Sequence, residues 1–479
     1  MNTEIYDEIK KEFPDYFTDT EILYEKIDRD YYNSIFREKA IYVWGIGETT
    51  RDLIRRIPSL NVLACIDSNC ETEFVRIENK DIAVILPSQM KKNVFCIVAS
   101  IYYEEIKRIL EKLGKEEGLD FLPYKVLLPT PTEMIGKMLE ADRITEWECG
   151  YHMNTKRLQR DGALAFCMNT SWLNPPNGNV FLQDYQEIHE SIKSRLIEIS
   201  IRKGIYCFCN KNRCSPLRES IEKKNGEIGN KRRLDINCAI AAFDRTCNLH
   251  CESCRNDMIV QNDRRINYLK NFFIKELLPI SDIINCAGEG EALFSKPYLE
   301  IFESCRNKDK RIIVLSNGTL ADKQKVDNLT EITNGKVAFS ISIDAYQKNT
   351  YESLRRGADF DKLMSNIKYI GEMVKNGRVC TLVFNYVISQ KNYKEIPDFI
   401  NMSKSIGASA LNFTLIGNWG TFSKEEFERI RVSDDYNNPI PKIDKLMKTV
   451  IEENRDIQIF FRREYDFRNY INEKLNSNS

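Results

Sequence analysis

The sequence predicts an α/β protein whose second half forms a partial barrel of six βα units. Short apolar, β-rich runs recur there, separated by stretches long enough for a helix. The runs lie at residues 238–243, 283–286, 312–315, 338–343, 380–388 and 411–416. Because buried strands alternate with amphipathic segments such as residues 363–375, we expect parallel βα units. The active site of a βα barrel lies at the carboxyl ends of its strands, so the residues just after each strand matter most.

The first 130 residues are predicted to form a separate Rossmann-like domain that resembles nucleotide-binding domains. Their apolar runs also alternate with helix-like segments, which indicates a parallel sheet with helices on both faces. The expected strands lie at residues 40–45, 62–66, 82–86 and 94–100, and the expected helices at residues 51–57 and 102–113.

A weak nucleotide-binding signal follows the first of these strands. Gly45 and Gly47 match two of the three glycines of a dinucleotide fingerprint, and Thr50 stands at the third position. Asp67 ends the next strand, where an acidic side chain can bind a ribose hydroxyl. The domain is therefore expected either to bind a nucleotide through Gly45, Gly47 and Asp67 or to be a scaffold that binds none.

The charge and composition of the chain exclude several classes of partner and indicate where the protein is located. The formal net charge is -1, so neither a nucleic acid nor an anionic membrane is an expected partner. No apolar run reaches membrane-spanning length and no signal-peptide core begins the chain, so we expect a cytoplasmic protein. In that compartment the 15 cysteines indicate metal ligation rather than disulfides.

The strongest motif is a cysteine triplet just after the first barrel strand. Cys247, Cys251 and Cys254 form a C-x3-C-x2-C pattern. Three thiolates at this spacing can hold a [4Fe-4S] cluster and leave one iron without a protein ligand. The alternative is a structural zinc site, which uses four ligands and stays closed.

The triplet resembles the signature of the radical S-adenosylmethionine (SAM) enzymes, and the following strand ends carry further motifs of that family. The resemblance implies a partial (βα)6 radical SAM barrel, in which SAM chelates the free iron. It also implies a set of cofactor-binding residues at the strand ends. These residues are Gly288, Gly290, Glu291, Asn317, Ser342 and Asp344. Two positions depart from the family pattern: Ala292 replaces a frequent proline, and Ser253 replaces a frequent aromatic residue before the third cysteine.

A second set of cysteines lies upstream of the barrel. Cys149 and Cys167 are spaced as C-x12-G-x4-C, and Cys209 and Cys214 follow as C-x4-C-x-P. This pattern resembles a SPASM-type auxiliary cluster domain, although such domains usually follow the barrel. Four thiolates would close every site of a second [4Fe-4S] cluster, and zinc is the competing occupant. Cys207 competes with Cys209 as a ligand, and the spacing to Cys214 favours Cys209.

Four segments are therefore expected. They are a Rossmann-like domain at 1–130, a SPASM-like domain at 131–234, the radical SAM barrel at 235–420 and a helical extension at 421–479, with boundaries near 129–131 and 230–234. The extension contains one β-like run at 457–461. Trp419, just before the extension, is expected to pack in the interior, with contact to substrate as the alternative.

The resemblance implies an enzyme of oxidoreductase or epimerase type that cleaves SAM reductively to a 5′-deoxyadenosyl radical. That radical abstracts a substrate hydrogen, and an electron donor such as flavodoxin or ferredoxin supplies the electron. The Rossmann-like domain favours a sugar-like or nucleotide-linked small molecule as substrate, with dehydrogenation or epimerisation as the outcome. One alternative is a maturase that modifies a peptide, and another is a non-catalytic metal- or nucleotide-binding protein. No catalytic side chain is identifiable.

Overall fold

The computed structural model describes residues 2–475 except 20, 38, 70–71, 169–171, 223–236, 261–262, 287, 289, 436, 463–469 and 472–473. The chain divides into two compact units. The first contains Met1–Asp235 and Asp263–Leu269, and the second contains Ile236–Asn262 and Lys270–Ser479. Within the described ranges, no helix has the length and apolarity needed to cross a membrane. The predicted boundary at 230–234 lies outside the described residues.

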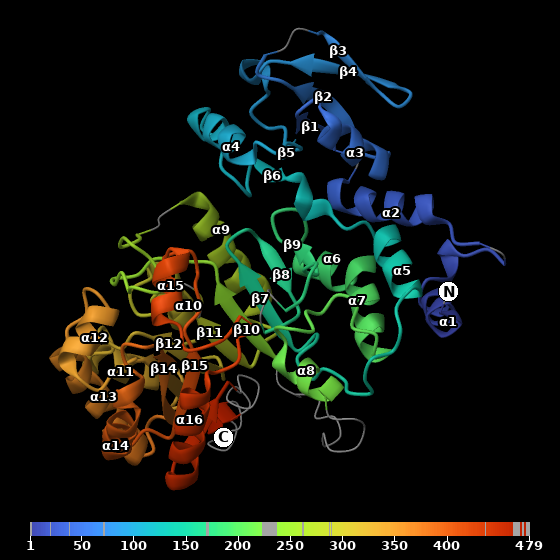
Figure 1. Cartoon of the computed structure of the whole chain (residues 1–479). Helices are drawn as coiled ribbons and strands as arrows, with labels where there is room; N and C mark the ends of the chain where they lie inside the picture. The colour runs from blue at the N-terminus through green and yellow to red at the C-terminus, as the bar shows by residue number, and fades with distance from the viewer. Residues whose placement is uncertain are drawn as a thin grey trace. The chain divides into compact units, whose positions relative to one another are not determined.

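The first unit begins with a six-stranded sheet in the order β3-β4-β2-β1-β5-β6 (Figure 1). All neighbours pair in parallel except β3 and β4. The strands are β1 Ile41–Trp44, β2 Val62–Ile66, β3 Phe74–Ile77, β4 Lys80–Ile85, β5 Cys96–Val98 and β6 Phe121–Pro123. The four predicted strands are thus present. In the sheet, β1 has β2 on one side and β5 on the other.

Each face of this sheet has its own helix. α3 (Glu48–Arg56) buries Leu53 in the same core as Val43, whereas α4 (Tyr103–Lys112) buries Leu110 in a second core with Trp44. Val43 and Trp44 are neighbours in β1, and successive strand residues point to opposite faces. The sheet is therefore covered on both sides, as the sequence predicts.

A helical core joins the N-terminus of the first unit to the residues after position 130. Ile5 and Ile9 of α1 and Ile27 of α2 are buried with Met134 and Met138 of α5. The helices are α1 Thr3–Glu12, α2 Tyr24–Phe36, α5 Pro131–Leu139, α6 Tyr185–His189, α7 Ile192–Arg202 and α8 Ser215–Glu222. A cut near residue 130 would remove part of this core, so the predicted domain boundary falls inside a packed unit.

The cysteine-rich region of the first unit contains a small antiparallel sheet. It consists of β7 (Thr155–Gln159), β8 (Ala163–Ala165) and β9 (Gly178–Asn179). Gly162 closes the β7–β8 turn at φ +79°, where an added Cβ would lie 2.4 Å from the Phe181 ring. Glycine is needed there both for the left-handed backbone and for the space.

The second unit contains a parallel sheet in the order β16-β15-β14-β13-β12-β11-β10. Its strands are β10 Cys238–Ala242, β11 Ile283–Cys286, β12 Arg311–Ser316, β13 Val337–Ser342, β14 Thr381–Ile388, β15 Ala410–Leu415 and β16 Gln458–Phe461. The six predicted barrel strands are all present. The predicted β-like run near the C-terminus extends the sheet as β16.

Helices cover one face of this sheet (Figure 1). Phe399 of α14 contacts the rings of Phe384, Tyr386 and Phe413, which face outward from β14 and β15. The helices of the second unit are α10 Lys296–Glu303, α11 Lys323–Ile332, α12 Lys348–Leu354, α13 Phe360–Lys375, α14 Ile396–Ile406, α15 Lys424–Ile430 and α16 Pro441–Glu453. α9 (Arg264–Phe272) begins in the first unit and continues as a π-helical turn, Phe273–Leu277, in the second. Residues that alternate with these rings, such as Asn385, therefore face inward.

One expectation about the C-terminal part is wrong. Trp419 was predicted to pack in the interior, but its side chain is 81% exposed. It stands in the loop after β15, between Gly417 and Gly420. The ring of Phe422, in the same loop, packs against Phe427 of α15.

Candidate functional site

The cysteine triplet lies at the carboxyl end of β10, where a buried carboxylate shapes the chain. Asp244 accepts hydrogen bonds from the Thr246 N–H at 2.9 Å and from the Ser295 hydroxyl at 2.5 Å. The Cys247 N–H donates to the Ile259 carbonyl at 2.9 Å, which brings the two ends of the triplet loop together. Asp244 therefore fixes the turn that presents Cys247.

A second segment of the chain holds the middle of this loop. The Glu252 N–H donates to the Leu354 carbonyl at 2.9 Å, and the His250 N–H donates to the Arg356 carbonyl at 3.2 Å. The Arg356 Nε donates back to the His250 carbonyl at 3.2 Å. Residues 354–356, at the end of α12, thus hold the triplet loop in place through main-chain hydrogen bonds. Such contacts cannot be recognised from motifs in the sequence.

Cys247 is buried, Cys251 is partly buried and Cys254 is exposed, and hydrogen-bond donors lie near two of the three sulfurs. Burial raises the pKa of Cys247 to about 11 and also raises that of Cys251. The Leu249 N–H lies 3.4 Å from the Cys247 Sγ, and Arg255 Nη2 lies 3.2 Å from the Cys254 Sγ. Hydrogen bonds and a cation next to sulfur stabilise thiolates. Three soft thiolate donors in this setting fit an iron–sulfur cluster.

Glu291 is completely buried beside the triplet. Its carboxylate accepts hydrogen bonds from the Ser316 hydroxyl at 2.6 Å, the Asn317 N–H at 2.6 Å and the Leu293 N–H at 3.0 Å. Burial raises its pKa, and these hydrogen bonds oppose the rise. Glu291 also lies close enough to raise the pKa of Cys247. The carboxylate is thus held rigidly next to the thiols.

Asp344 follows β13 in a left-handed conformation, with φ of +67°. Aspartate tolerates this region better than most residues. Its carboxylate accepts from the Val387 N–H at 2.8 Å and pairs with Arg355 at 2.6 Å. Arg355 lowers the pKa of the Cys251 thiol, whereas Asp344 raises it, so both lie near the triplet.

Sequence reasoning missed Arg355. Its side chain is 12% exposed, and its Nε has no hydrogen-bond partner within the described part of the chain. The Tyr351 hydroxyl nearby is also buried without a described partner. A donor left free beside three thiols and a buried carboxylate suits an anionic group of a ligand.

The remaining predicted cofactor residues lie at the same edge of the sheet. Asn317 donates through its side chain to Asn248 at 3.0 Å, which joins the end of β12 to the triplet loop. Gly288 has φ of +135° and approaches Ala242, and Ser342 ends β13 beside Asn385. Glu289 of the glycine–glutamate motif lies outside the described residues. The ligand roles of these positions stay predictions.

Gly290 offers a direct test of this geometry. A Cβ added there would lie 2.4 Å from the Asp244 carbonyl and 2.9 Å from that of Thr246. Backbone must therefore shift at the turn that presents Cys247, so we expect Gly290→Ala to reduce SAM cleavage on the order of 100-fold. Gly136→Ala is the matched control, since nothing lies within 4 Å of its added Cβ. Equal 5′-deoxyadenosine formation by both variants would contradict the prediction.

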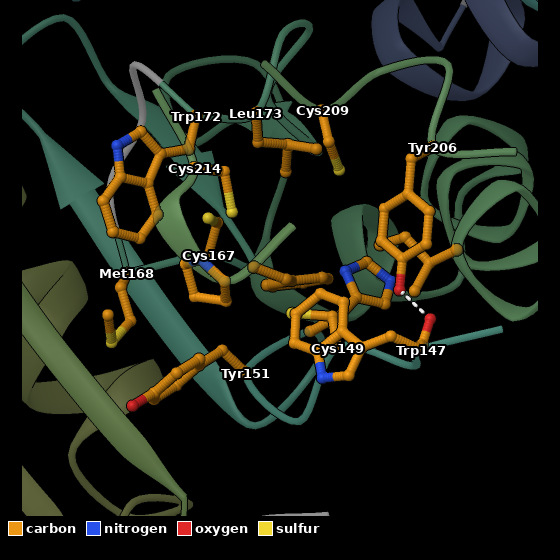
Figure 2. Close-up of a pocket in the computed structure, with 14 residues that line it drawn as sticks. Trp147, Cys149, Tyr151, Cys167, Met168, Trp172, Leu173, Tyr206, Cys209 and Cys214 are labelled. Atoms are coloured by element: carbon orange, nitrogen blue, oxygen red, sulfur yellow. Dashed lines mark hydrogen bonds between the residues drawn. The ribbon is translucent and has the colours of Figure 1, made fainter. Parts of the chain in front are cut away.

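The upstream cysteines converge on one pocket of the first unit. Figure 2 shows Cys149, Cys167, Cys209 and Cys214 around it. Burial raises the pKa of Cys209 well above its ordinary value, and the other three cysteines contribute to the rise. The rest of the lining is largely aromatic or aliphatic and includes Trp147, Phe166, Met168, Trp172, Leu173 and Ile201. Four thiols in an apolar pocket fit a fully ligated cluster.

Local structure explains how these cysteines meet. Cys167 follows β8 directly, so the Gly162 turn sets its position. Asn210 ties the segment between Cys209 and Cys214, because its carbonyl accepts the Cys214 N–H at 2.9 Å. Cys207 is not part of the pocket lining, and its Sγ lies 3.9 Å from the Lys137 carbonyl. The structure therefore places Cys209 rather than Cys207 with the other three cysteines.

One pocket residue was not singled out from the sequence. His152 lines the cysteine pocket, and neither of its ring nitrogens has a hydrogen-bond partner among the described residues. Burial lowers its pKa to about 4, and the main chain of Phe166 opposes this shift. His152 lies three residues after Cys149 in the sequence, and this spacing alone did not indicate a functional role.

The candidate nucleotide site of the first unit is tightly built. Gly45 has φ of +121°, and a Cβ there would lie 2.7 Å from the Ala99 carbonyl. The buried Thr50 hydroxyl, at the third glycine position, lies 3.4 Å from the same carbonyl. Gly47 caps α3, and Asp67 accepts the Asn69 N–H at 2.8 Å. Asp67 therefore stabilises its own turn, and nucleotide binding stays a prediction.

Within the described residues, no three Cys, His, Asp or Glu side chains are arranged to hold a single metal ion. Both cysteine groups are therefore candidates on the chemistry of their donors and on their convergence. Their ligand assignments remain predictions.

Comparison with known proteins supports part of this interpretation. Residues 243–402 match the model of the Radical SAM superfamily. The chain is 26% identical over 184 residues to the antilisterial bacteriocin subtilosin biosynthesis protein AlbA of Bacillus subtilis, covering 38% of this chain and 40% of AlbA. It is 22% identical over 209 residues to the tungsten-containing aldehyde ferredoxin oxidoreductase cofactor-modifying protein of Pyrococcus furiosus, covering 42% and 56%.

Solved structures match only part of the chain. Streptococcus suis SuiB bound to precursor peptide SuiA aligns with a TM-score of 0.36 and 12% identity, covering 47% of this chain and 48% of SuiB. The anSMEcpe protein with AdoMet and a Cp18Cys peptide aligns with a TM-score of 0.35 and 19% identity, covering 46% and 62%. The chain thus spans about half the length of the relatives it matches.

Proposed function

We propose that this chain, which carries a radical SAM domain over residues 243–402, cleaves SAM reductively and modifies a peptide. The observation that carries the proposal is the convergence of three cysteines, Glu291 and Arg355 at the carboxyl ends of the strands. Members of the superfamily use a [4Fe-4S] cluster and SAM. In the proposal, Cys247, Cys251 and Cys254 hold that cluster.

In the proposal, the cofactor has one role, electron supply, and the side chains have another, the binding of SAM. A [4Fe-4S] cluster held by Cys247, Cys251 and Cys254 would supply the electron for the reductive cleavage of SAM. The chain's own residues bind and orient SAM: Glu291 is rigid beside Cys247, and Arg355 offers a free Nε beside Cys251. An amino group suits the carboxylate and a carboxylate suits the guanidinium. The two ends of the amino-acid part of SAM are thereby distinguished.

Two substitutions of Arg355 test whether its side chain binds SAM or only neutralises the charge of Asp344. We expect Arg355→Gln to raise the KM for SAM on the order of 30-fold or more, because a charged hydrogen bond is lost in a buried site. Arg355→Lys keeps a cation beside Asp344 but loses the planar fork, so an intermediate KM is expected. Arg429→Gln on the exposed surface of α15 is the control. Unchanged KM values in both Arg355 variants would remove this residue from the SAM site.

The inner face of the barrel offers hydrogen-bond acceptors to a polar substrate, and a peptide is one class that fits them. Asn412 donates to Asn385 at 3.0 Å, and Asn385 donates to Ser340 at 2.8 Å, so an amide ladder crosses three strands. The side-chain oxygens of Asn412 and Asn285 are buried without a partner in the described part of the chain. These acceptors suit main-chain N–H groups, which every peptide presents. The partial similarity to a bacteriocin biosynthesis protein supports the same substrate class.

The peptide proposal can be tested by mass spectrometry. Full-length protein, reconstituted anaerobically and reduced with dithionite in place of a flavodoxin or ferredoxin donor, is supplied with SAM and the peptides encoded by neighbouring genes. A peptide that loses two hydrogen atoms, or exchanges one with solvent, together with faster 5′-deoxyadenosine formation, supports the proposal. Stimulation by nucleotide-linked sugars but by no such peptide would instead support a small-molecule substrate.

A further inference from the structure

The cysteine pocket of the first unit contains a buried polar side chain, His152, on which the main chain of Phe166 acts without a hydrogen bond of ordinary geometry. Both ring nitrogens of His152 are buried, and neither makes a hydrogen bond to any described residue. Buried polar groups in folded proteins are nearly always paired, so an unpaired one points to a partner not supplied by the chain. The ring lines the same pocket as Cys149, Cys167, Cys209 and Cys214.

Among the side chains that line the pocket, the possible acceptors for this ring are the sulfur atoms and the hydroxyls of Tyr151 and Tyr206. The Tyr206 hydroxyl donates to the Trp147 carbonyl at 2.6 Å (Figure 2), and neither tyrosine oxygen accepts a hydrogen bond from His152. In either protonation state an imidazole ring carries at least one N–H. The sulfurs of an iron–sulfur cluster and of its ligands accept hydrogen bonds, and these bonds change its potential.

We infer that His152 donates a hydrogen bond to the cluster, or to a ligating thiolate, in this pocket and raises its reduction potential. The inference rests on the proposed second cluster. Reduction adds one negative charge to the cluster, and an N–H directed at sulfur stabilises that charge. His152 is thus a positioning residue for the redox level of the upstream site, not a ligand.

The test isolates the upstream site in the full chain. All variants carry the triplet substitutions Cys247→Ala, Cys251→Ala and Cys254→Ala, and each is reconstituted anaerobically. Iron content is measured first, and the midpoint potential then follows from a redox titration monitored by electron paramagnetic resonance (EPR). His152→Phe removes the N–H, and His152→Gln retains an N–H donor. His189→Phe is the matched control, because His189 stacks near Phe166 and Tyr185 outside the pocket lining.

We expect His152→Phe to keep its iron and to shift the midpoint potential to a more negative value, with altered g-values. His152→Gln should return the potential toward that of the background protein, and His189→Phe should leave it unchanged. Equal potentials in the Phe, Gln and background proteins overturn the inference. Loss of iron in both His152 variants also overturns it, because His152 would then be a ligand or a packing element.

Failure of the inference can be told apart from failure of the proposed function. A background protein that binds no iron, or only zinc, overturns the second cluster and with it the role of His152. SAM cleavage by the unsubstituted chain is measured separately and depends on the triplet. The result of the SAM-cleavage assay therefore does not depend on the reduction potential of the upstream cluster.

Discussion

Replacing Cys247, Cys251 and Cys254 together by alanine is expected to abolish 5′-deoxyadenosine formation. The three thiols are gathered at the end of β10, and Glu291 and Arg355 lie beside them. Their loss removes the iron that binds SAM, so the rate should fall to background, on the order of a 10³-fold loss or more. The assay is liquid chromatography of 5′-deoxyadenosine after anaerobic reduction with dithionite.

The control for this triple variant must also remove thiols without touching the site. Cys65→Ala and Cys96→Ala serve, because both side chains are buried in β2 and β5 of the N-terminal sheet. They should retain parental SAM cleavage. If the triple variant still forms 5′-deoxyadenosine at the parental rate, the triplet does not hold the reactive iron.

The second large effect is on iron content. We expect the reconstituted chain to hold about eight irons, about half of them lost in the triplet variant. A variant lacking Cys149, Cys167, Cys209 and Cys214 should lose the other half. Iron, acid-labile sulfide and zinc are measured on the same samples. Zinc without iron in the triplet variant would make the upstream site structural.

Most of the fold could be predicted from the sequence because its signals are local. Each barrel strand is a short apolar run, and each is followed by a segment long enough for a helix. The same holds for β1 of the N-terminal sheet, which α3 follows. The packing of α1 against α5 was not predictable, because Ile5 and Met134 are far apart in the sequence and their contact is tertiary.

The candidate site shows a similar division. The cysteines could be identified from their spacing, and Glu291 from the resemblance of its strand end to a family motif. Arg355, Asn412 and His152 were missed because their importance depends on burial and on unpaired atoms. Neither property is written in local sequence, whereas strand ends and cysteine spacing are.

The measurement that tests SAM binding at the triplet most directly is the EPR spectrum of the reduced full-length protein before and after SAM is added. We expect two reduced-cluster signals, of which one changes when SAM binds the iron that lacks a protein ligand. The changing signal should be absent from the variant that lacks Cys247, Cys251 and Cys254. A spectrum that SAM leaves unchanged, or a change that persists in the triplet variant, would contradict the proposed site.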